Sequence, residues 1–365
     1  MTEIQKKKML LGFIMDGTSG GVDNYILHFL DAVKEEGLQI DLLTNEADPE
    51  LKECLLREYG SHLYEIANLH HPVRQFRQVR ELIRREQYGM VYLNISTSMD
   101  CIAALAARSM HVPRRMLHSH SGGNDCESAA KRAVFDTLQK ICRTFLYRAG
   151  TEFMPALRKR DIGCIRKKWW NPVNSCDCQC SRSETIFISS EIREEIRKEL
   201  GIEDAFVIGH AGNFCYQKIM SFDPGFEEIY KKNQKTVLLL VGRGIRMEQI
   251  RRQVKEAGLE KAVHFLGWRP DVERIFQAMD VFVLPSHFEG LPTVGVEAQC
   301  TGLSCVLSDT ITAETKITEN CMFLPAKEAP SEWADAILQM TGKERSSAVF
   351  LKEAKTIRWK RRNRC

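Results

Sequence analysis

The chain has 365 residues, of which 44% are hydrophobic and 27% charged, which is ordinary globular composition and enough chain for two domains of usual size. The formal net charge of +4 is too small to indicate nucleic acid as a partner, and no apolar run approaches the ~20 residues that a membrane-spanning helix needs. The basic start and the apolar run at residues 9–15 lack the length and the cleavage site of a signal peptide. We therefore expect a cytoplasmic protein.

Short apolar runs alternate with segments of helical periodicity through the first half of the chain. The apolar runs predict strands at residues 9–15, 40–43, 61–66, 91–94 and 115–117. A glycine-rich loop at residues 17–21 follows the first of them, and residues 23–35 then carry apolar side chains on one helical face. Repeated strand–helix units predict a parallel sheet with helices on both faces.

Residues 72–88 predict a basic amphipathic helix. Five arginines are interleaved there with five apolar side chains, namely Arg74, Arg77, Arg80, Arg84 and Arg85 with Val73, Phe76, Val79, Leu82 and Ile83. A helix of this kind can rest on an anionic membrane surface, which would place the protein at the inner face of the membrane. The alternative is a solvated face, which is the commoner role of a charge-rich helix.

Two histidines, His118 and His120, follow directly after the strand expected at residues 115–117. They stand where the carboxyl ends of parallel strands meet, which is the edge at which α/β proteins bind ligands. Loop histidines are also commonly satisfied by neighbouring side chains or water. Both interpretations remain open from these residues alone.

The thirteen cysteines are scattered along the chain. Three lie inside apolar stretches and indicate buried thiols rather than disulfides: Cys101, Cys300 and Cys305. Residues 176–180 form a C-x-C-x-C run, but the second cysteine pair of a usual zinc site does not follow, so no metal is predicted. The surrounding segment, residues 151–188, is basic with little periodicity, and no element is predicted for it.

The second half repeats the pattern of strands and helices. Strands are expected at residues 206–209, 236–241, 263–266, 281–284 and 304–307. The chain therefore divides into two doubly wound halves. We assign residues 1–175 to an N-terminal domain, residues 176–340 to a C-terminal domain and residues 341–365 to a basic tail.

Residues 280–309 form the most informative stretch of the chain. Pro292 suits the first helical position and Gly302 would stop the helix, which predicts a strand–loop–helix–strand unit. Glu289 precedes this helix and Glu297 lies eight positions later, inside it, so the two cannot share one proton. They can instead hold two parts of an elongated ligand, such as a nucleotide-sugar, whose anionic middle sits on the helix N-terminus. The alternative is a capped helix with a solvent-facing Glu.

The run Pro285-Ser286-x-x-Glu289-Gly290-x-Pro292 with Glu297-Ala298 resembles the donor-site signature of family 4 (group 1) glycosyltransferases, which are retaining enzymes of the GT-B fold. Within that family the chain is most similar to bacterial capsular and exopolysaccharide enzymes, on the strength of residues 118–120 and 308–312. The resemblance implies an α/β chain of two facing Rossmann-like, doubly wound domains, the first on the acceptor side and the second binding the donor. It also implies metal-independent transfer of a sugar from a nucleotide-sugar, by preference a UDP-sugar, to a polysaccharide or lipid-linked oligosaccharide, with no further cofactor.

The same resemblance implies roles for individual side chains. Lys218 matches the family lysine that contacts the diphosphate, Glu289 is assigned to the hydroxyls of the donor sugar, and Glu297 to those of the ribose. His118 would contact the sugar and the acceptor, with His120 as the second candidate. Lys218, Glu289 and His118 are therefore the catalytic candidates.

Backbone groups complete the expected donor site. Gly20 and Gly21 would let the chain approach the donor from the first domain. Gly290 and Leu291 precede the helix whose N-terminus offers partial positive charge to the diphosphate.

Asn213 departs from the family pattern, which has Arg five positions before the lysine. Asn donates hydrogen bonds but brings no charge, and losing a charge-assisted bond of roughly 1.5–3 kcal/mol would slow the chemistry about ten- to a hundredfold. A catalytically weak or inactive homologue that binds nucleotide-sugar or a partner transferase is therefore the alternative function. A nucleotide-sugar epimerase lacks a supporting acid/base cluster, and an NAD dehydrogenase is disfavoured because the first loop is not G-x-G-x-x-G.

Overall fold

A computed structural model describes residues 7–15, 21–120, 126, 128–154, 188–218 and 225–345. The chain divides into two compact units, Met1–Gln179 and Cys180–Cys365. Several features of the sequence lie outside the described residues: most of the glycine-rich loop with Gly20, the C-x-C-x-C run, most of residues 151–188, and the tail beyond residue 345.

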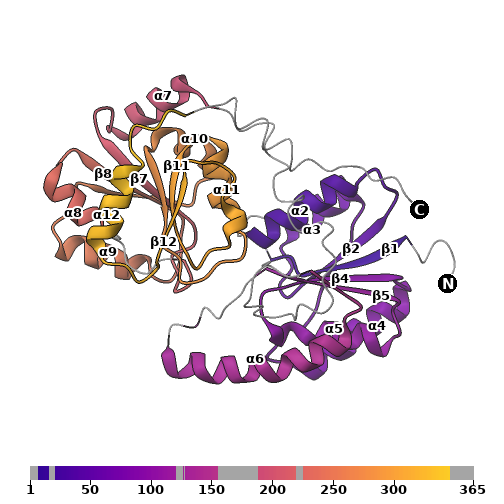
Figure 1. Ribbon diagram of the computed structural model, residues 1–365. Helices are drawn as coiled ribbons and strands as arrows, with labels where there is room; N and C mark the ends of the chain where they lie inside the picture. Colours follow the sequence, from indigo (N-terminus) through magenta and orange to yellow (C-terminus); the bar gives the residue numbers. More distant parts are fainter. Residues whose placement is uncertain are drawn as a thin grey trace. The chain divides into compact units, whose positions relative to one another are not determined.

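The first unit is a parallel sheet covered by helices (Figure 1). In chain order its elements are β1 (Lys8–Gly12), α2 (Gly21–Val33), β2 (Gln39–Thr44), α3 (Pro49–Tyr59), β3 (Leu63–Glu65), α4 (Pro72–Glu86), β4 (Met90–Ile95), the 3-10 helix η1 (Ser98–Asp100), α5 (Cys101–Ser109), β5 (Arg114–Ser119), α6 (Ala129–Ala149) and β6 (Glu152–Met154). The strand order is β3-β2-β1-β4-β5-β6.

The second unit is built in the same way. Its elements are α7 (Ser190–Leu200), β7 (Phe206–Ala211), α8 (Phe226–Lys232), β8 (Thr236–Val241), α9 (Met247–Glu256), β9 (Val263–Gly267), α10 (Val272–Ala278), β10 (Val281–Leu284), α11 (Thr293–Cys300), β11 (Ser304–Ser308), the 3-10 helix η3 (Ala313–Thr315), β12 (Cys321–Leu324) and α12 (Pro330–Gln339). The strand order β12-β11-β10-β7-β8-β9 is that of the first unit read from the other edge.

Alternating side chains on each strand explain why helices cover both faces. On β8, Leu238 and Leu240 pack with α8, α9 and α12, while Leu239 and Val241 pack with α7, α10 and α11. The first unit shows the same division, with α4, α5 and α6 on one face and α2 and α3 on the other (Figure 1). A strand that is apolar on both faces is buried only between two helical layers.

Each sheet has one point where the direction of strand progression reverses, between β1 and β4 and between β7 and β10. In doubly wound folds the crevice beyond the carboxyl ends of the strands at this point is where ligands bind. The predicted α/β class with two Rossmann-like sheets is confirmed, and the candidate residues of the second unit lie at such a point.

The boundaries of several predicted elements were wrong in detail. The strand expected at residues 9–15 ends at Gly12, and the one expected at 61–66 covers only Leu63–Glu65. Pro292 is the residue before α11 and has extended backbone, so the helix begins at Thr293 rather than at the proline. The strands β6 and β12 were not predicted.

Two further findings concern the surface and the thiols. None of the described helices has the length and apolar character required to cross a membrane. Cys101, Cys300 and Cys305 are buried, as predicted, and form no disulfide within the described residues; burial raises the pKa of the Cys305 thiol.

Candidate functional site

Two loops meet beyond the carboxyl ends of β7 and β10 in the second unit. The loop after β7 is residues 212–218 and the loop after β10 is residues 285–292, and the backbone N–H of His287 donates to the carbonyl of Gln217 at 2.8 Å. Gly212 has φ 151° and Gly242, which follows β8, has φ 134°. A Cβ at Gly242 would lie 1.9 Å from the carbonyl oxygen of Gly212, so only glycine permits this close approach of the two backbones.

Glu289 is the carboxylate of this loop pair and is enclosed, with 6% of its surface exposed. The amide of Gln217 donates to Oε2 at 2.9 Å, and the hydroxyl of Ser286 donates to Oε1 at 3.3 Å. Nζ of Lys218 lies 3.2 Å from Oε1. Both carboxylate oxygens are therefore held by groups from the two loops.

Lys218 runs across the backbone at Gly212, where a Cβ would lie 3.0 Å from the lysine Cδ. Its own carbonyl oxygen lies 3.4 Å from the hydroxyl of Ser286, as an alternative acceptor to Glu289 for that proton. About a fifth of the lysine side chain is exposed, against 6% for its partner Glu289. The ammonium thus lies at the boundary between the buried carboxylate and solvent, where an anionic ligand can reach it.

A buried histidine lies beneath this lysine. His210, on β7, is 3% exposed, and its Nδ1 lies 3.0 Å from the carbonyl oxygen of Val283 on β10. A carbonyl only accepts, so Nδ1 carries the proton and Nε2 presents a lone pair. Burial lowers the pKa of His210 to about 4 against the smaller opposing effect of the Val283 carbonyl, and Nε2 has no hydrogen-bond partner in the described structure.

The helix α11 supplies the other part of the predicted donor site. Gly290 and Leu291 precede it, and no side chain caps its first turn. Glu297 lies on it half-buried. Gln299, which is fully buried, fixes the helix: its amide donates to the carbonyls of Gly295 and Thr315 at 2.8 and 2.7 Å.

Asn213 lies in the loop after β7 and is exposed. Its carbonyl accepts from the N–H of Cys215 at 3.0 Å, in the same loop as Lys218. The position at which the family has Arg is therefore open to solvent.

In the first unit, hydrogen bonds link Tyr25, Tyr92 and His118. The two phenol oxygens are 2.5 Å apart, and the Tyr92 hydroxyl lies 2.9 Å from Nδ1 of His118. All three are at most 7% exposed. Burial first, and then the neighbouring ring of His120, lower the pKa of His118, so the imidazole is neutral.

His120 is held at the strand reversal of the first sheet. Its Nε2 lies 2.7 Å from Oδ1 of Asn94, whose amide in turn donates to the carbonyl of Gly12 at 3.2 Å. Burial lowers the pKa of His120 to about 4. The rings of His118 and His120 are 4.1 Å apart, so the two histidines form one cluster at the carboxyl ends of β1, β4 and β5.

Gly21 is the first residue of α2, directly after the residues outside the description. Two residues later, Asp23 is fully buried and its Oδ1 accepts from the N–H of Met15 at 3.0 Å. This carboxylate fixes the end of the β1 segment to the start of α2. Gly20 lies outside the described residues.

The structure brings together Lys218 with Glu289, and His118 with His120, each pair within its own unit. Sequence reasoning missed the residues that support them, chiefly His210, Gln217, Tyr92 and Asn94. A polar residue inside an apolar run was the available signal for His210, Tyr92 and Asn94. Gln217 carried no signal beyond standing next to Lys218.

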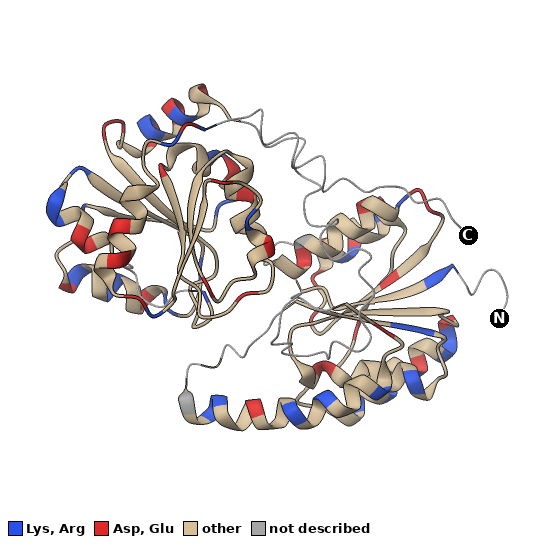
Figure 2. Cartoon of the chain, viewed as in Figure 1, with Lys and Arg blue, Asp and Glu red and all other residues tan. Residues whose placement is uncertain are grey.

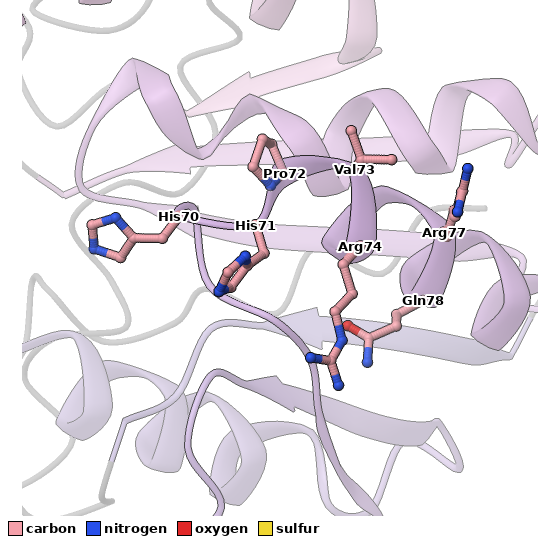
Figure 3. A pocket seen from close by; sticks show the side chains of 7 residues that line it. All are labelled: His70, His71, Pro72, Val73, Arg74, Arg77 and Gln78. Atoms are coloured by element: carbon pink, nitrogen blue, oxygen red, sulfur yellow. The ribbon is translucent and has the colours of Figure 1, made fainter.

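The predicted basic amphipathic helix is α4, on which Val79, Leu82 and Ile83 are buried. A hollow of about 470 Å³ lies at its start and is lined by His70, His71, Pro72, Val73, Arg74, Arg77 and Gln78 (Figure 3). Arg74 and Gln78 extend to one side of the chain there, and Val73 and Arg77 to the other (Figure 3). Figure 2 shows Lys and Arg along both α4 and α6.

Within the ranges that the structure describes, no three His, Cys, Asp or Glu side chains come close enough together to hold a metal ion.

Comparison with known proteins places these features in a family. Residues 205–343, which carry both loops and α11, match the model of the family described as glycosyl transferases group 1. The chain is 26% identical over 357 residues to the predicted glycosyltransferase EpsF of Bacillus subtilis (strain 168), covering 95% of this chain and 91% of that one. It is also 26% identical over 303 residues to the UDP-Gal:alpha-D-GlcNAc-diphosphoundecaprenol alpha-1,3-galactosyltransferase of Escherichia coli, covering 79% of this chain and 76% of that one.

A solved structure shares the architecture. HepE of Anabaena, in complex with UDP and glucose, superposes with a TM-score of 0.71 at 18% identity, covering 96% of this chain and 97% of that one. Residues 205–343 therefore belong to the group 1 glycosyl transferases, and the similarity to glycosyltransferases along most of the chain, together with the two strand orders, shows a glycosyltransferase with the GT-B fold.

Proposed function

We propose that this glycosyltransferase moves a sugar from a UDP-sugar, with retention and without a metal, to a lipid-linked oligosaccharide or a growing polysaccharide of the capsular or exopolysaccharide type. The observation that carries the proposal is the pairing of Lys218 with the enclosed carboxylate of Glu289 at the strand reversal between β7 and β10. One cation and one acceptor, fixed together, suit a ligand with an anionic part next to hydroxyl groups.

The chemistry explains why both charges are needed. Breaking the bond between sugar and diphosphate leaves negative charge on the departing phosphate, which oriented donors must stabilise. Lys218 would supply charge, and the N-terminus of α11 would supply backbone N–H groups and a partial positive charge. Glu289 would accept from hydroxyls of the donor sugar, and Glu297 from those of the ribose.

The preference for UDP and for a lipid-linked acceptor rests on the relatives. The name of the E. coli relative gives a UDP-sugar as donor and a sugar on a diphospholipid as acceptor. HepE was solved with UDP and glucose, although 18% identity makes that likeness one of fold alone. In the first unit, neutral His118 and His120 would contact the donor sugar and the acceptor hydroxyl. The backbone at Gly20 and Gly21 would approach the donor.

Nothing in the fold or among the relatives favours the inactive alternative that Asn213 suggested. The exposed Asn213 lies in the same loop as Lys218 and would donate to the diphosphate without charge. We therefore propose an active enzyme. Because Asn213 stands where the family has Arg, binding of the diphosphate would depend more strongly on Lys218 than in a site that has both cations.

A donor screen tests the function. Purified chain is incubated with UDP-, GDP- and ADP-sugars and lipid-diphosphate acceptors, and nucleotide release is measured with and without EDTA. Release from UDP-sugars that EDTA leaves unchanged supports the proposal, and NMR of the product's anomeric proton reports retention or inversion. Nucleotide binding without release from any donor would contradict it and favour the inactive homologue.

A lipid-linked acceptor requires that the protein work at a membrane surface, and we propose that α4 makes this contact at the inner face. Arg74 and Arg77 are exposed and have no acidic partner within the described ranges, and Val73 is 63% exposed beside them. Cationic and apolar side chains on one exposed turn suit anionic headgroups and the acyl boundary beneath them. The arginines at the other end of the helix, Arg84 and Arg85, pair instead with Glu81 and Glu86.

A further inference from the structure

The imidazole of His210 has a buried acceptor that nothing in the resting structure uses. Its Nδ1–H donates to the carbonyl of Val283, which leaves the Nε2 lone pair facing away from that strand. Nε2 has no partner in the part of the chain that the structure describes, and the side chain is 3% exposed. A buried polar atom without a partner costs free energy, which indicates a role that the resting structure does not show.

The surroundings of Nε2 identify what it can bind. A Cβ at Gly212 would lie 3.8 Å from Nε2 of His210 and 3.7 Å from Nζ of Lys218. Both nitrogens are therefore close to the same point above the Gly212 backbone. The rings of Phe214 and Phe282 lie 5.8 and 6.5 Å from the imidazole between centroids, and neither can donate a conventional hydrogen bond.

Lys218 has three N–H donors, and among the residues that the structure describes its ammonium pairs with Glu289 alone. When hydroxyls of the sugar donate to the Glu289 carboxylate, the Lys218 ammonium needs another acceptor on the protein. With that acceptor in place, a remaining N–H group stays directed at the diphosphate. We propose that His210 is a positioning residue whose Nε2 accepts a hydrogen bond from Lys218 in the donor-bound state. The proposal deepens the proposed function and rests on it.

The tautomer explains why histidine suits this place. A protonated His210 would present N–H instead of a lone pair and would put a second positive charge beside Lys218. Burial keeps the imidazole neutral, since it lowers the pKa to about 4. The carbonyl of Val283 holds the proton on Nδ1, so β10 sets the direction of the lone pair.

A double-mutant cycle tests the coupling. His210→Phe removes the acceptor while keeping a planar ring, and we expect kcat/KM for the donor to fall about ten- to a hundredfold, since a bond to a charged group is lost once the donor is bound. In the background of Lys218→Ala the same change should have little further effect. His210→Gln, which keeps an acceptor, should restore part of the loss.

Phe282→Leu is the matched control, because it alters packing against the other side of the imidazole without touching Nε2. In the double variant with Lys218→Ala, the fold-changes in kcat/KM of the two single variants should multiply. If the effects of His210→Phe and Lys218→Ala also multiply, His210 acts only through packing and the inference is overturned.

A second measurement does not need turnover. In ¹⁵N-labelled protein, Nε2 of His210 should resonate as an unprotonated nitrogen and shift when UDP is added, and the shift should be absent in Lys218→Ala. A protonated Nε2, or the same shift in both proteins, overturns the inference. Wild-type chain that neither binds UDP nor releases nucleotide would sink the proposed function itself, and an active wild type with an uncoupled His210 would sink only this step.

Discussion

Nζ of Lys218 lies 3.2 Å from Oε1 of Glu289, and the two side chains reach each other from loops that follow different strands of one sheet. Because Glu289 is almost fully enclosed, removing the lysine leaves a desolvated carboxylate without its cation. We expect Lys218→Ala to lower the free energy of unfolding by about 2 kcal/mol, less than for a fully buried pair, because the lysine is partly exposed. Transfer should fall more than ~100-fold. Urea unfolding and nucleotide release measure the two effects.

Lys231→Ala is the control for that substitution. Lys231 pairs with Glu227 and Glu228 on the exposed side of α8, so the change should cost less than ~1 kcal/mol and leave transfer unchanged. Equal losses in the two variants would show that the Lys218–Glu289 pair has no special role.

The Tyr92 hydroxyl joins two buried partners, so its removal should be costly. Tyr92→Phe leaves the Tyr25 hydroxyl without one of its contacts and Nδ1 of His118 without its bond. We expect the free energy of unfolding to fall by about 2 kcal/mol and transfer to fall with it, because the His118 ring loses the contact that orients it. Tyr59→Phe removes a hydroxyl that donates to exposed Asp31 and should cost less than ~1 kcal/mol. Normal transfer by Tyr92→Phe would separate His118 from the reaction.

Gln299 connects α11 to the segment after η3, and we expect this link to set the position of the donor helix. Besides its two donated bonds, its Oε1 accepts from the N–H groups of Ile317 and Thr318 at 2.9 and 3.1 Å. Gln299→Leu leaves these partly buried backbone groups without their partner and should cost about 2 kcal/mol. The KM for the donor should rise as well, because Glu297 and the helix N-terminus share the same helix. Gln253→Leu on α9, whose side chain makes no hydrogen bond in the described structure, should be neutral within ~1 kcal/mol. Unfolding midpoints that agree for both variants would refute the link.

Much of this fold could be predicted because its strands are short apolar runs bounded by turn residues. The strands β8 and β10 have the predicted bounds, and the Glu289-Gly290 turn carries the family signature. The strands β6 and β12 were missed for a physical reason. β6 has three residues and lies at a sheet edge, and β12 is only partly buried at the corresponding edge of the second sheet, so neither needs a long apolar run.

The supporting polar contacts could not be predicted for a different reason. Which residue meets the Glu289 carboxylate depends on how two separate loops fold over each other, and Gln217 and Ser286 look like ordinary loop residues in the sequence. The same holds for His210, whose lone pair is directed by the pairing of β7 with β10. Strand order, which a single sequence does not state, decides these contacts.

Buried neutral histidines predict a loss of stability in acid. Burial lowers the pKa of both His120 and His210 to about 4, below the ordinary value of 6.5, so the unfolded chain takes up these protons first as the pH falls. The free energy of unfolding should therefore be unaffected by these groups above about pH 6.5 and decrease between pH 6.5 and 4, by on the order of 3 kcal/mol for each. His210→Gln should remove the contribution of His210 to this pH dependence, so the free energy of unfolding, measured by urea unfolding, should fall less between pH 6.5 and 4. A slope that stays the same in the variant would mean that His210 is not neutral because of burial.

The start of α4 gives a prediction about membranes. Arg74 and Arg77 line the hollow at the helix start and are exposed, so reversing both charges with Arg74→Glu and Arg77→Glu should leave folding intact. It should reduce co-sedimentation with vesicles of anionic phosphatidylglycerol about tenfold or more, since each basic residue near the surface contributes about 1 kcal/mol. The matched control reverses Arg252 and Lys255, two exposed cations three positions apart on α9 of the second unit. Val73→Ser separates the apolar contribution, which should weaken binding without changing its dependence on salt. Equal binding by the α4 and α9 variants, or equal binding to neutral vesicles, would show that α4 is an ordinary solvated surface.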